Sequence, residues 1–408
     1  MNDFSPRVSV LMPVYNGEQY LDEAVQSILC QTFRDFEFLI IDDGSTDGTK
    51  AILDSYNDER IRLVRNERNM GLTKSLNRGL VLARGDYIAR QDADDVSHPE
   101  RLAKQVQFLE SNPQVGMLGT AYQRIDVHGL PLSTVEVLAS NSEIQDALLY
   151  GNRFCHGSVM LRQKALEAVG NHCYEMAEPA EDYDLWLRMS ERFEVANLPE
   201  VLYSLRMHSA SLSSVRAAEQ RRCARMAVEK ALERRFREYG SALVSDEALA
   251  RCYLELGLQH VAEGDCLSAS KYFDKSLEVY PQRDLWESDF ELLALRKVMD
   301  LYHVVLRPSL SHEDAALVSV GFVQRVSRMM PSSQYRRAAL EARMLSELRI
   351  SMAFACYRDK IYGPVPKLCL LGLWGDRRWL GNRGVLSIAI HSVLKRANRF
   401  LERRILEK

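Results

Sequence analysis

Residues 36–48 read FEFLIIDDGSTDG, an apolar run that one glutamate interrupts and that two aspartates and a turn follow. An apolar run of this length, closed by turn residues, is typical of a strand buried on both faces of a parallel sheet. The residues after it predict a helix from about Thr46, with Ser45 or Thr46 as its N-terminal cap.

The same alternation continues on both sides of this stretch. Further strands are predicted at 8–14, 61–64 and 85–89, with helices from Glu18 and over 73–83. Strands that alternate with amphipathic helices indicate an α/β fold with a mostly parallel sheet. Ligands of such sheets bind where strands end. The polar clusters at 42–45 and 92–95 both lie at such ends.

Beyond about residue 216 the sequence favours long helices, so we expect an α/β domain over 1–215 and an all-α part after it. We divide that part into a helical region, 216–335, and a basic helical region, 336–408. Seven residues of the former match the offsets of one tetratricopeptide repeat: Tyr253, Leu256, Gly257, Gly264, Ala269, Phe273 and Pro281. One repeat cannot bury its own faces. Neighbouring helices, a protein partner or a second copy of the chain must then cover them.

Composition places the chain among globular proteins of a reducing compartment. Its 408 residues are 46% hydrophobic, and its eight cysteines form no CxxC pair. The longest uncharged apolar run, 368–375, is much shorter than the roughly 18 residues of a membrane span. The first seven residues lack an apolar signal region. We therefore expect free thiols and a cytoplasmic location.

The net charge of −3 conceals an asymmetry. Residues 336–408 contain 16 Lys and Arg against 6 Asp and Glu. Within them, 385–408 predicts an amphipathic helix with a basic face, which suits peripheral contact with an anionic membrane at its inner face. Nucleic acid is not expected as a partner, because the basic region lacks interleaved aromatic residues.

Three carboxylates in four residues, Asp92, Asp94 and Asp95, directly follow a predicted strand. Their mutual repulsion is unfavourable unless a cation or strong donors offset it. Oxygen ligands of this kind suit Mg²⁺ or Mn²⁺ bridged to phosphates better than Zn²⁺. The alternative is an acidic N-terminal cap for the helix predicted at Pro99.

Seven motifs together resemble, in order and spacing, the family 2 glycosyltransferases over residues 7–210. They are Pro13-Val-Tyr15-Asn16, Ile41-Asp42-Asp43-Gly44-Ser45, Asn69-Met-Gly71, Asn77, Gly85-Asp86-Tyr87, Asp92-Ala93-Asp94-Asp95 and Glu181-Asp182-Tyr-Asp-Leu-Trp-Leu-Arg188. The resemblance implies an inverting enzyme of the GT-A fold. Such an enzyme moves a sugar from a nucleotide-diphosphate sugar, expected to be a UDP-sugar, to a hydroxyl of a saccharide or lipid-linked saccharide, as in surface-polysaccharide or lipopolysaccharide assembly.

Carried over residue by residue, the resemblance implies a donor site. Asp42 would accept a hydrogen bond from the base, and Asp92 would face the ribose. The other residues assigned to the nucleotide sugar are Pro13, Tyr15, Asn16, Arg68, Asn69, Gly71 and Ala93. Helix capping is the alternative for Asp42, and Arg68 could equally be a solvated loop residue.

The remaining roles concern metal and catalysis. Asp94 would bind Mn²⁺ or Mg²⁺ bridged to the diphosphate, which stabilises the leaving group. Asp95 would assist, and His208 would approach the metal or the diphosphate. Asp182 would be the general base that takes the proton of the acceptor hydroxyl; its alternative is a helix cap. His156 matches an acceptor-side segment, or is an ordinary polar residue at a strand end.

Three rival functions are weighed against this one. A dehydrogenase is disfavoured because no GxGxxG follows the first strand. A sugar nucleotidyltransferase should carry a Gly-rich basic loop where this chain has Pro13-Val-Tyr-Asn-Gly-Glu. An inactive glycosyltransferase-like scaffold, binding partners through its helices, conflicts with the presence of every acid that the reaction needs.

Overall fold

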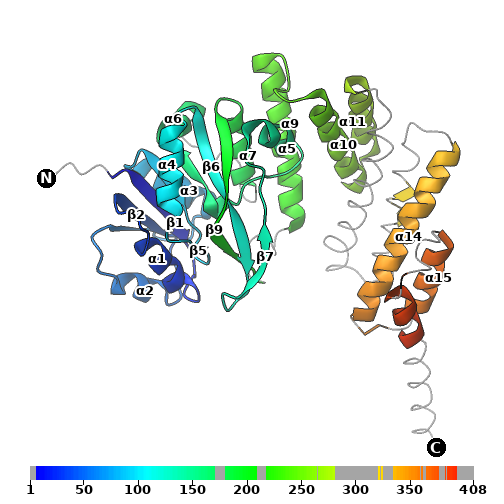
Figure 1. The fold of residues 1–408 in the computed structure, drawn as a ribbon, viewed down its shortest axis with the longest axis horizontal. Helices are drawn as coiled ribbons and strands as arrows, with labels where there is room; N and C mark the ends of the chain where they lie inside the picture. Colours follow the sequence, from blue (N-terminus) through cyan, green and yellow to red (C-terminus); the bar gives the residue numbers. More distant parts are fainter. Residues whose placement is uncertain are drawn as a thin grey trace, which may run out of the picture. The chain divides into compact units, whose positions relative to one another are not determined.

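The computed structural model describes residues 6–170, 180–208, 217–263, 265–280, 320–321, 323–324, 334–358, 360–361, 364–375, 382 and 384–392. The chain forms two compact units, residues 1–248 and 249–408. The first unit therefore extends past the predicted boundary at 215 (Figure 1). The separation of 216–335 from 336–408 stays a prediction.

The first unit is built on a nine-stranded sheet with the order β3-β2-β1-β4-β8-β6-β9-β5, and β7 pairs with β6 beside this path. The strands are β1 (Val8–Val14), β2 (Phe36–Asp42), β3 (Ile61–Arg65), β4 (Tyr87–Arg90), β5 (Val96–Ser97), β6 (Val115–Ile125), β7 (Pro131–Val135), β8 (Met160–Arg162) and β9 (Glu194–Arg206).

The first four strands pair in parallel. β1 lies between β2 and β4, and β3 pairs with the other edge of β2. The other half is mixed. β8 is antiparallel to β4 and β6, and β9 runs parallel to β6 and antiparallel to β5. The expected α/β class with a mostly parallel sheet is confirmed.

Helices cover both faces of the parallel half, as the alternation of side chains along β1 requires. Val8, Val10 and Met12 share one core cluster with side chains of α1 (Leu21–Leu29), α2 (Thr49–Ser55) and α4 (Arg101–Ser111). Leu11 faces the other way, toward α3 (Leu72–Leu82). There, a Cβ on Gly79 would lie 2.2 Å from the Cδ1 atom of Leu11, so the glycine permits the close approach.

The start of α2 differs from the prediction. The helix begins at Thr49, and neither Ser45 nor Thr46 caps it. The Ser45 hydroxyl instead accepts a hydrogen bond from the Asn16 amide, and the Thr46 amide donates to the Asn16 side chain. The polar groups of the loop after β2 therefore form hydrogen bonds with the loop after β1 and do not cap the next helix.

The remaining helical elements of the first unit are α5 (Asn141–Leu148), η1 (His156–Ser158), α6 (Gln163–Val169), α7 (Glu181–Ser190) and α9 (Ala217–Tyr239). α9 packs on α7 through buried polar contacts. Arg235 donates to the Ser190 hydroxyl at 3.0 Å and to the Ala242 carbonyl at 2.9 Å, and Arg234 pairs with Glu191 at 2.8 Å. These contacts explain why α9 belongs to the first unit.

The described residues of the second unit form helices and parts of the segments between them. α10 (Asp246–Glu263), which begins just before the unit boundary, packs on α11 (Cys266–Val279). The Ser276 hydroxyl donates to the Ala250 carbonyl, and a Cβ on Gly257 would meet the Phe273 ring. A tetratricopeptide repeat here stays a prediction, because Gly264 and Pro281 lie outside the described residues.

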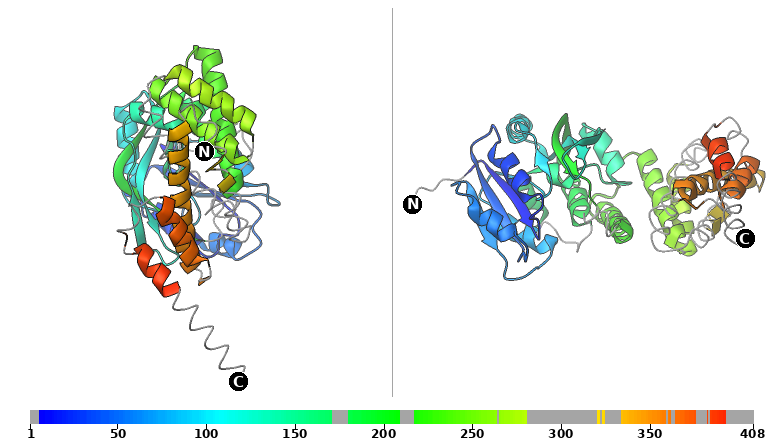
Figure 2. Two further views of the ribbon diagram at one scale, coloured as in Figure 1. Left: turned by 90° about the vertical axis from the view of Figure 1, so that its right-hand side faces the viewer. Right: turned by 90° about the horizontal axis from the view of Figure 1, so that it is seen from below.

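Farther along, α14 (Gln334–Arg358) and α15 (Val365–Gly375) lie side by side (Figures 1 and 2). A third helical segment, 384–392, joins their core through Val385 and Ile388. The rest of the predicted basic helix, 393–408, lies outside the described residues. Among the described helices none is both long and apolar enough to cross a membrane.

The contact of α9 with α7 predicts a stability difference between two arginines of one helix. Arg235→Ala removes a fully buried guanidinium and leaves its acceptors without their donor, which should cost about 2–4 kcal/mol of unfolding free energy. Arg237→Ala is the control, because Arg237 is 69% exposed, and should stay within about 0.5 kcal/mol of the parent. Urea unfolding measures both. Equal stability of the two variants would contradict the packing of α9 on α7.

Candidate active site

The loop after β1 is anchored by its own polar groups. Asn16 has a φ of 51°, its amide donates to Ser45, and its side-chain oxygen accepts from Thr46 at 2.8 Å. Pro13 is buried within β1. Tyr15 presents its large side chain to solvent, with 47% of its surface exposed. Of the three predicted residues, Pro13 and Asn16 thus shape the loop, and Tyr15 offers a contact surface.

Asp42 lies at the end of β2 and is buried. Its Oδ1 atom accepts from the Ser45 amide at 3.0 Å, and its Oδ2 atom lies 3.6 Å from Nε of Arg65. Asp42 thus closes the turn after the strand and does not cap α2, whose cap position is Gly48 without a side-chain bond. Its second oxygen retains capacity for another donor.

The neighbouring Asp43 has a role that sequence reasoning missed. Its buried carboxylate accepts from the Asn66 side chain at 2.6 Å and from the amides of Met70 and Gly71, both at 2.9 Å. These bonds hold the loop 66–71 against the end of β2. A sequence signal existed, because a glycine-containing loop between strand and helix leaves amides that need an acceptor.

The loop 66–71 brings Arg68, Asn69 and Gly71 to the same edge as Asp42. Gly44, with a φ of +72°, allows this approach, since a Cβ there would lie 2.6 Å from the Arg68 carbonyl carbon. Gly71 has a φ of +93° and donates its amide to the Asn69 side chain at 3.0 Å. The side chains of Arg68 and Asn69 are exposed at this edge.

The acidic turn 92–95 follows β4 and is held by several donors. Buried Arg90 pairs with Asp92 Oδ1 at 2.6 Å. Asp95 is buried and accepts from the Tyr203 hydroxyl at 2.9 Å and from the Arg206 amide at 2.7 Å. Asp95 therefore supports the turn from within, and the helix α4 starts farther on, at Arg101.

Asp94 and His208 are brought together, as the prediction of a shared metal site requires. Nε2 of His208 lies 2.8 Å from Oδ2 of Asp94. Burial, and then repulsion from Asp92, raise the pKa of Asp94, while His208 opposes the shift. Burial and the same neighbouring carboxylates raise the pKa of Asp95 well above its usual range. Ala93 packs against the core beneath the turn.

This turn concentrates negative charge that a cation would relieve. No group of three or more His, Cys, Asp or Glu side chains suited to a metal ion occurs among the residues that the structure describes. Asp94 and His208 would supply two ligands of the kind that Mn²⁺ and Mg²⁺ accept. Cations of this type commonly take their other ligands from phosphates and water, so the residues fit a metal that binds together with a diphosphate.

Arg206 locks the end of β9 against the turn. Its Nε donates to the Asp94 carbonyl at 2.8 Å, and its guanidinium lies 4.6 Å from the centre of the Tyr20 ring. The same group pairs with Glu23. The His208 ring also packs on Tyr20, and the centroids of the two rings lie 5.3 Å apart. Arg206 therefore places His208 beside Asp94.

Arg101 is a second residue that sequence reasoning missed. Its fully buried guanidinium donates to Ser97 at 2.8 Å and to the Arg90 carbonyl at 2.7 Å, and it lies 5.1 Å from the Tyr203 ring centre. Burial lowers the pKa of Arg101 to about 10, so the group stays positive at neutral pH. No spacing in the sequence distinguishes Arg101 from the exposed arginines of other helices.

Asp182 lies in the first turn of α7, and its Oδ2 atom accepts from the Asn152 side chain at 3.0 Å. It does not cap the helix, whose cap position is Ala180 without a side-chain bond. Asp184 is buried and pairs with Arg188 at 3.0 Å. Asp182 is only partly buried and is the more accessible of the two acids.

His156 connects this region with the acidic turn. Its ring packs edge-on against Trp186 with centroids 5.8 Å apart. Burial, followed by the charge of Arg90, lowers the pKa of His156 to about 4, while Asp182 and Asp92 act in the opposite direction. His156 is therefore neutral at pH 7. Its chain neighbour Gly157 lies against the acidic turn, since a Cβ on Gly157 would be 2.7 Å from Oδ2 of Asp92.

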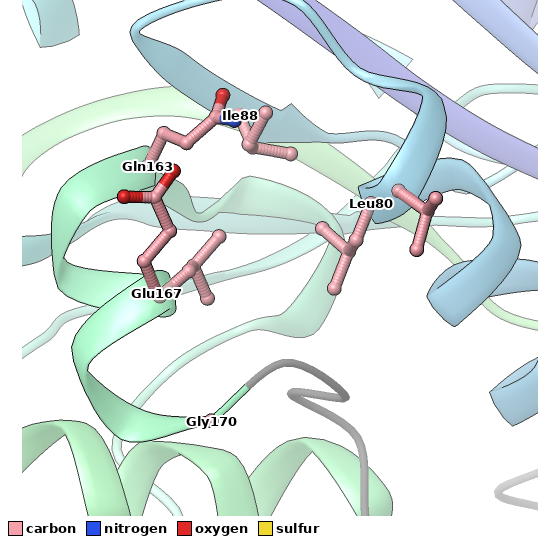
Figure 3. A pocket seen from close by; sticks show the side chains of 7 residues that line it. Leu80, Ile88, Gln163, Glu167 and Gly170 are labelled. Carbon is pink, nitrogen blue, oxygen red and sulfur yellow. The ribbon is translucent and has the colours of Figure 1, made fainter.

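A small crevice elsewhere on the first unit shares no residue with this site (Figure 3). It lies between α3, β4 and α6, where Leu80 and Ile88 face Gln163 and Glu167.

Comparison with known proteins assigns the family. The model for glycosyl transferase family 2 matches residues 9–170. EpsE of Bacillus subtilis, which carries the name of a glycosyltransferase, is 42% identical over 209 residues, 50% of this chain and 74% of EpsE. The amylovoran biosynthesis glycosyltransferase AmsE of Erwinia amylovora is 35% identical over 212 residues, 49% of this chain and 76% of AmsE.

A solved structure of Staphylococcus aureus TarS 1–349 in complex with UDP-GlcNAc aligns with a TM-score of 0.44 at 19% identity, and covers 88% of this chain and 93% of that one. The family assignment depends on the sequence matches, because EpsE and AmsE are each covered over about three-quarters of their length. The chain belongs to glycosyl transferase family 2 and is a glycosyltransferase.

Proposed function

We propose that this enzyme transfers a sugar, with inversion, from a UDP-sugar to a hydroxyl of a saccharide or lipid-linked saccharide in surface-polysaccharide assembly. One observation carries the proposal. The acidic turn 92–95 follows β4, the neighbour of β1 in the sheet, and a Cβ on Gly17 in the loop after β1 would lie 3.8 Å from Cβ of Ala93. The turn also contacts η1, because a Cβ on Gly157 would lie 2.7 Å from Oδ2 of Asp92. His156 of the same element packs against Trp186 of α7, the helix whose first turn carries Asp182.

On the donor side, the loops after β1 and β2 hold the nucleotide. Asp42 accepts from the base through Oδ2, the oxygen that the Ser45 amide does not use. Tyr15 offers its exposed ring to the base, and Arg68 and Asn69 offer donors to the sugar or the phosphates. Asp92, held by Arg90, faces the ribose. Four of the assigned residues act only by setting the backbone conformation of their loops: Pro13, Asn16, Gly71 and Ala93.

On the metal side, Asp94 and His208 would hold Mn²⁺ or Mg²⁺ when the donor's diphosphate binds. When bound, such a cation neutralises the charge that develops on the departing diphosphate. The chain's own groups prepare this position: Arg206 holds the Asp94 carbonyl, and Tyr20 supports the His208 ring.

On the acceptor side, Asp182 takes the proton as the acceptor oxygen attacks the anomeric carbon. The new glycosidic bond forms while the bond from that carbon to the diphosphate oxygen breaks, and the nucleoside diphosphate leaves with the electron pair. Attack from the face opposite the leaving group inverts the configuration. Asn152 orients Asp182 by its hydrogen bond.

Two further expectations remain proposals. The basic residues of 336–408 bring the enzyme to the inner face of an anionic membrane, where a lipid-linked acceptor would lie. The helical part binds a protein partner or a second copy of the chain. A sugar nucleotidyltransferase and an inactive scaffold are the alternatives, and the activity assay below distinguishes both from a transferase.

Removal of either acid should abolish turnover while leaving the fold intact. Asp182→Ala is expected to lower Mn²⁺-dependent hydrolysis of UDP-sugars by about 10²–10⁴-fold, the range found for loss of a general base. Asp94→Ala should lower the same rate because it removes a proposed ligand of the cation. Asp86→Asn is the matched control, because Asp86 is an exposed acid before the start of β4 and should retain full activity. Equal rates in all four proteins would refute the proposed chemistry.

Asp182→Asn distinguishes the proposed role of Asp182 as the base from the proposed role of Asp94 in binding the metal and the donor. The base is not needed for donor binding, so UDP in the presence of Mn²⁺ should bind this variant within about twofold of the parent, whereas Asp94→Ala should bind it much more weakly. Isothermal titration with UDP and Mn²⁺ measures both affinities. Equal weakening by the two substitutions would place Asp182 in the donor site instead.

The depressed pKa of His156 predicts a stability loss in acid. The unfolded chain binds a proton near pH 6.5, whereas the folded chain does so only near pH 4. The contribution of neutral His156 is therefore complete above pH 6.5 and falls as the pH drops toward 4. Urea midpoints at pH 7.5 and 5 should differ less for His156→Gln than for the parent. An unchanged difference would show that His156 titrates normally.

A further inference from the structure

We propose that Tyr203 is a positioning residue for cation binding, because its hydroxyl sets the shape of the turn that carries Asp92 and Asp94. The proposal rests on the metal site proposed above. It adds to that site a residue of β9, which follows Asp92 by 111 residues in the sequence. Tyr203 touches neither the donor nor the cation. Its effect passes through the backbone of the acidic turn.

The hydroxyl of Tyr203 makes two hydrogen bonds to opposite ends of the turn. It accepts from the Asp92 amide at 3.2 Å and donates to Oδ2 of Asp95 at 2.9 Å. One oxygen atom thus joins the first and last residues of the segment 92–95. Since the Asp92 amide is fixed, the direction in which the Asp92 and Asp94 side chains leave the backbone is fixed with it.

The tyrosine itself has no room to move. Its ring is 1% exposed and lies under the buried guanidinium of Arg101. Gly157 of η1 closes the remaining side, because a Cβ at that position would lie 1.9 Å from the Tyr203 hydroxyl and 2.7 Å from Oδ2 of Asp92. The glycine therefore leaves space for the hydroxyl and the Asp92 carboxylate together.

The second oxygen of Asp95 is also occupied, since Oδ1 accepts from the Arg206 amide at 2.7 Å. With both oxygens bonded inward, Asp95 supports the turn rather than the cation. The Asp94 carboxylate lies beside His208, with its Oδ2 atom 2.8 Å from Nε2 of the histidine. Asp95 thus supports the turn from within, and the Tyr203 hydroxyl bonds both to Asp95 and to the Asp92 amide.

Tyr203→Phe tests the role with the loss of one oxygen atom. We would titrate the full chain with Mn²⁺ in the presence of UDP and follow free Mn²⁺ by electron paramagnetic resonance, a readout independent of turnover. The variant is expected to bind Mn²⁺ about tenfold more weakly, the lower end of the range for groups that orient metal ligands.

Tyr87→Phe is the matched control. Tyr87 is an equally buried tyrosine of the same sheet, its hydroxyl accepts from Arg162 at 3.3 Å, and it does not touch the turn. This variant should lose comparable thermal stability and keep its Mn²⁺ affinity. Gly157→Ala is the second variant if Tyr203→Phe does not fold, and its added methyl group should weaken Mn²⁺ binding in the same direction.

The outcomes separate this inference from the function on which it rests. Normal Mn²⁺ affinity in Tyr203→Phe, with binding lost in Asp94→Ala, would overturn the role of Tyr203 and leave the metal site in place. An equal loss of Mn²⁺ affinity in Tyr87→Phe would also overturn it, because a general loss of stability of the sheet would then explain both results. Normal affinity in Asp94→Ala would reject the metal site itself, and this inference with it.

Discussion

The buried guanidinium of Arg101 is the interaction on which the active-site edge depends. It joins α4 to the carbonyl of Arg90 at the end of β4, to Ser97 of β5 and to the ring of Tyr203 in β9. A charge in the protein interior is tolerated only when hydrogen bonds satisfy it. Once those bonds form, the ends of three strands are held at one place, and the acidic turn starts from a rigid base.

Repulsion between carboxylates is the second constraint on this edge. The acids of the turn cannot all be charged at close range without partners, and each has a different one: Arg90 for Asp92, His208 for Asp94, and the Tyr203 hydroxyl for Asp95. Arg206 adds its amide and its guanidinium to the same turn. Each of the three acids is therefore held by a different donor.

The parallel strands could be predicted nearly to the residue, because a buried strand must be continuously apolar and the turn after it must be polar. β1 and β2 show this most clearly. The helix starts were less predictable. Ser45 looked like a cap for α2, but its hydroxyl serves the Asn16 amide, a partner 29 residues away that local pattern cannot reveal. α9 likewise joins the first unit through Arg235, whose burial depends on α7.

By itself, the sequence determined the α/β class, the family and the acids that lie at the strand ends, because apolar periodicity and short motifs are local properties. Only the tertiary structure decided which donors bond to each of those acids. Asp43 and Asp95 resemble their neighbours in the sequence, yet each is turned inward by donors from distant segments, the loop 66–71 for one and β9 for the other. A carboxylate's role is set by the donors that reach it, and those donors come together only when the chain has folded.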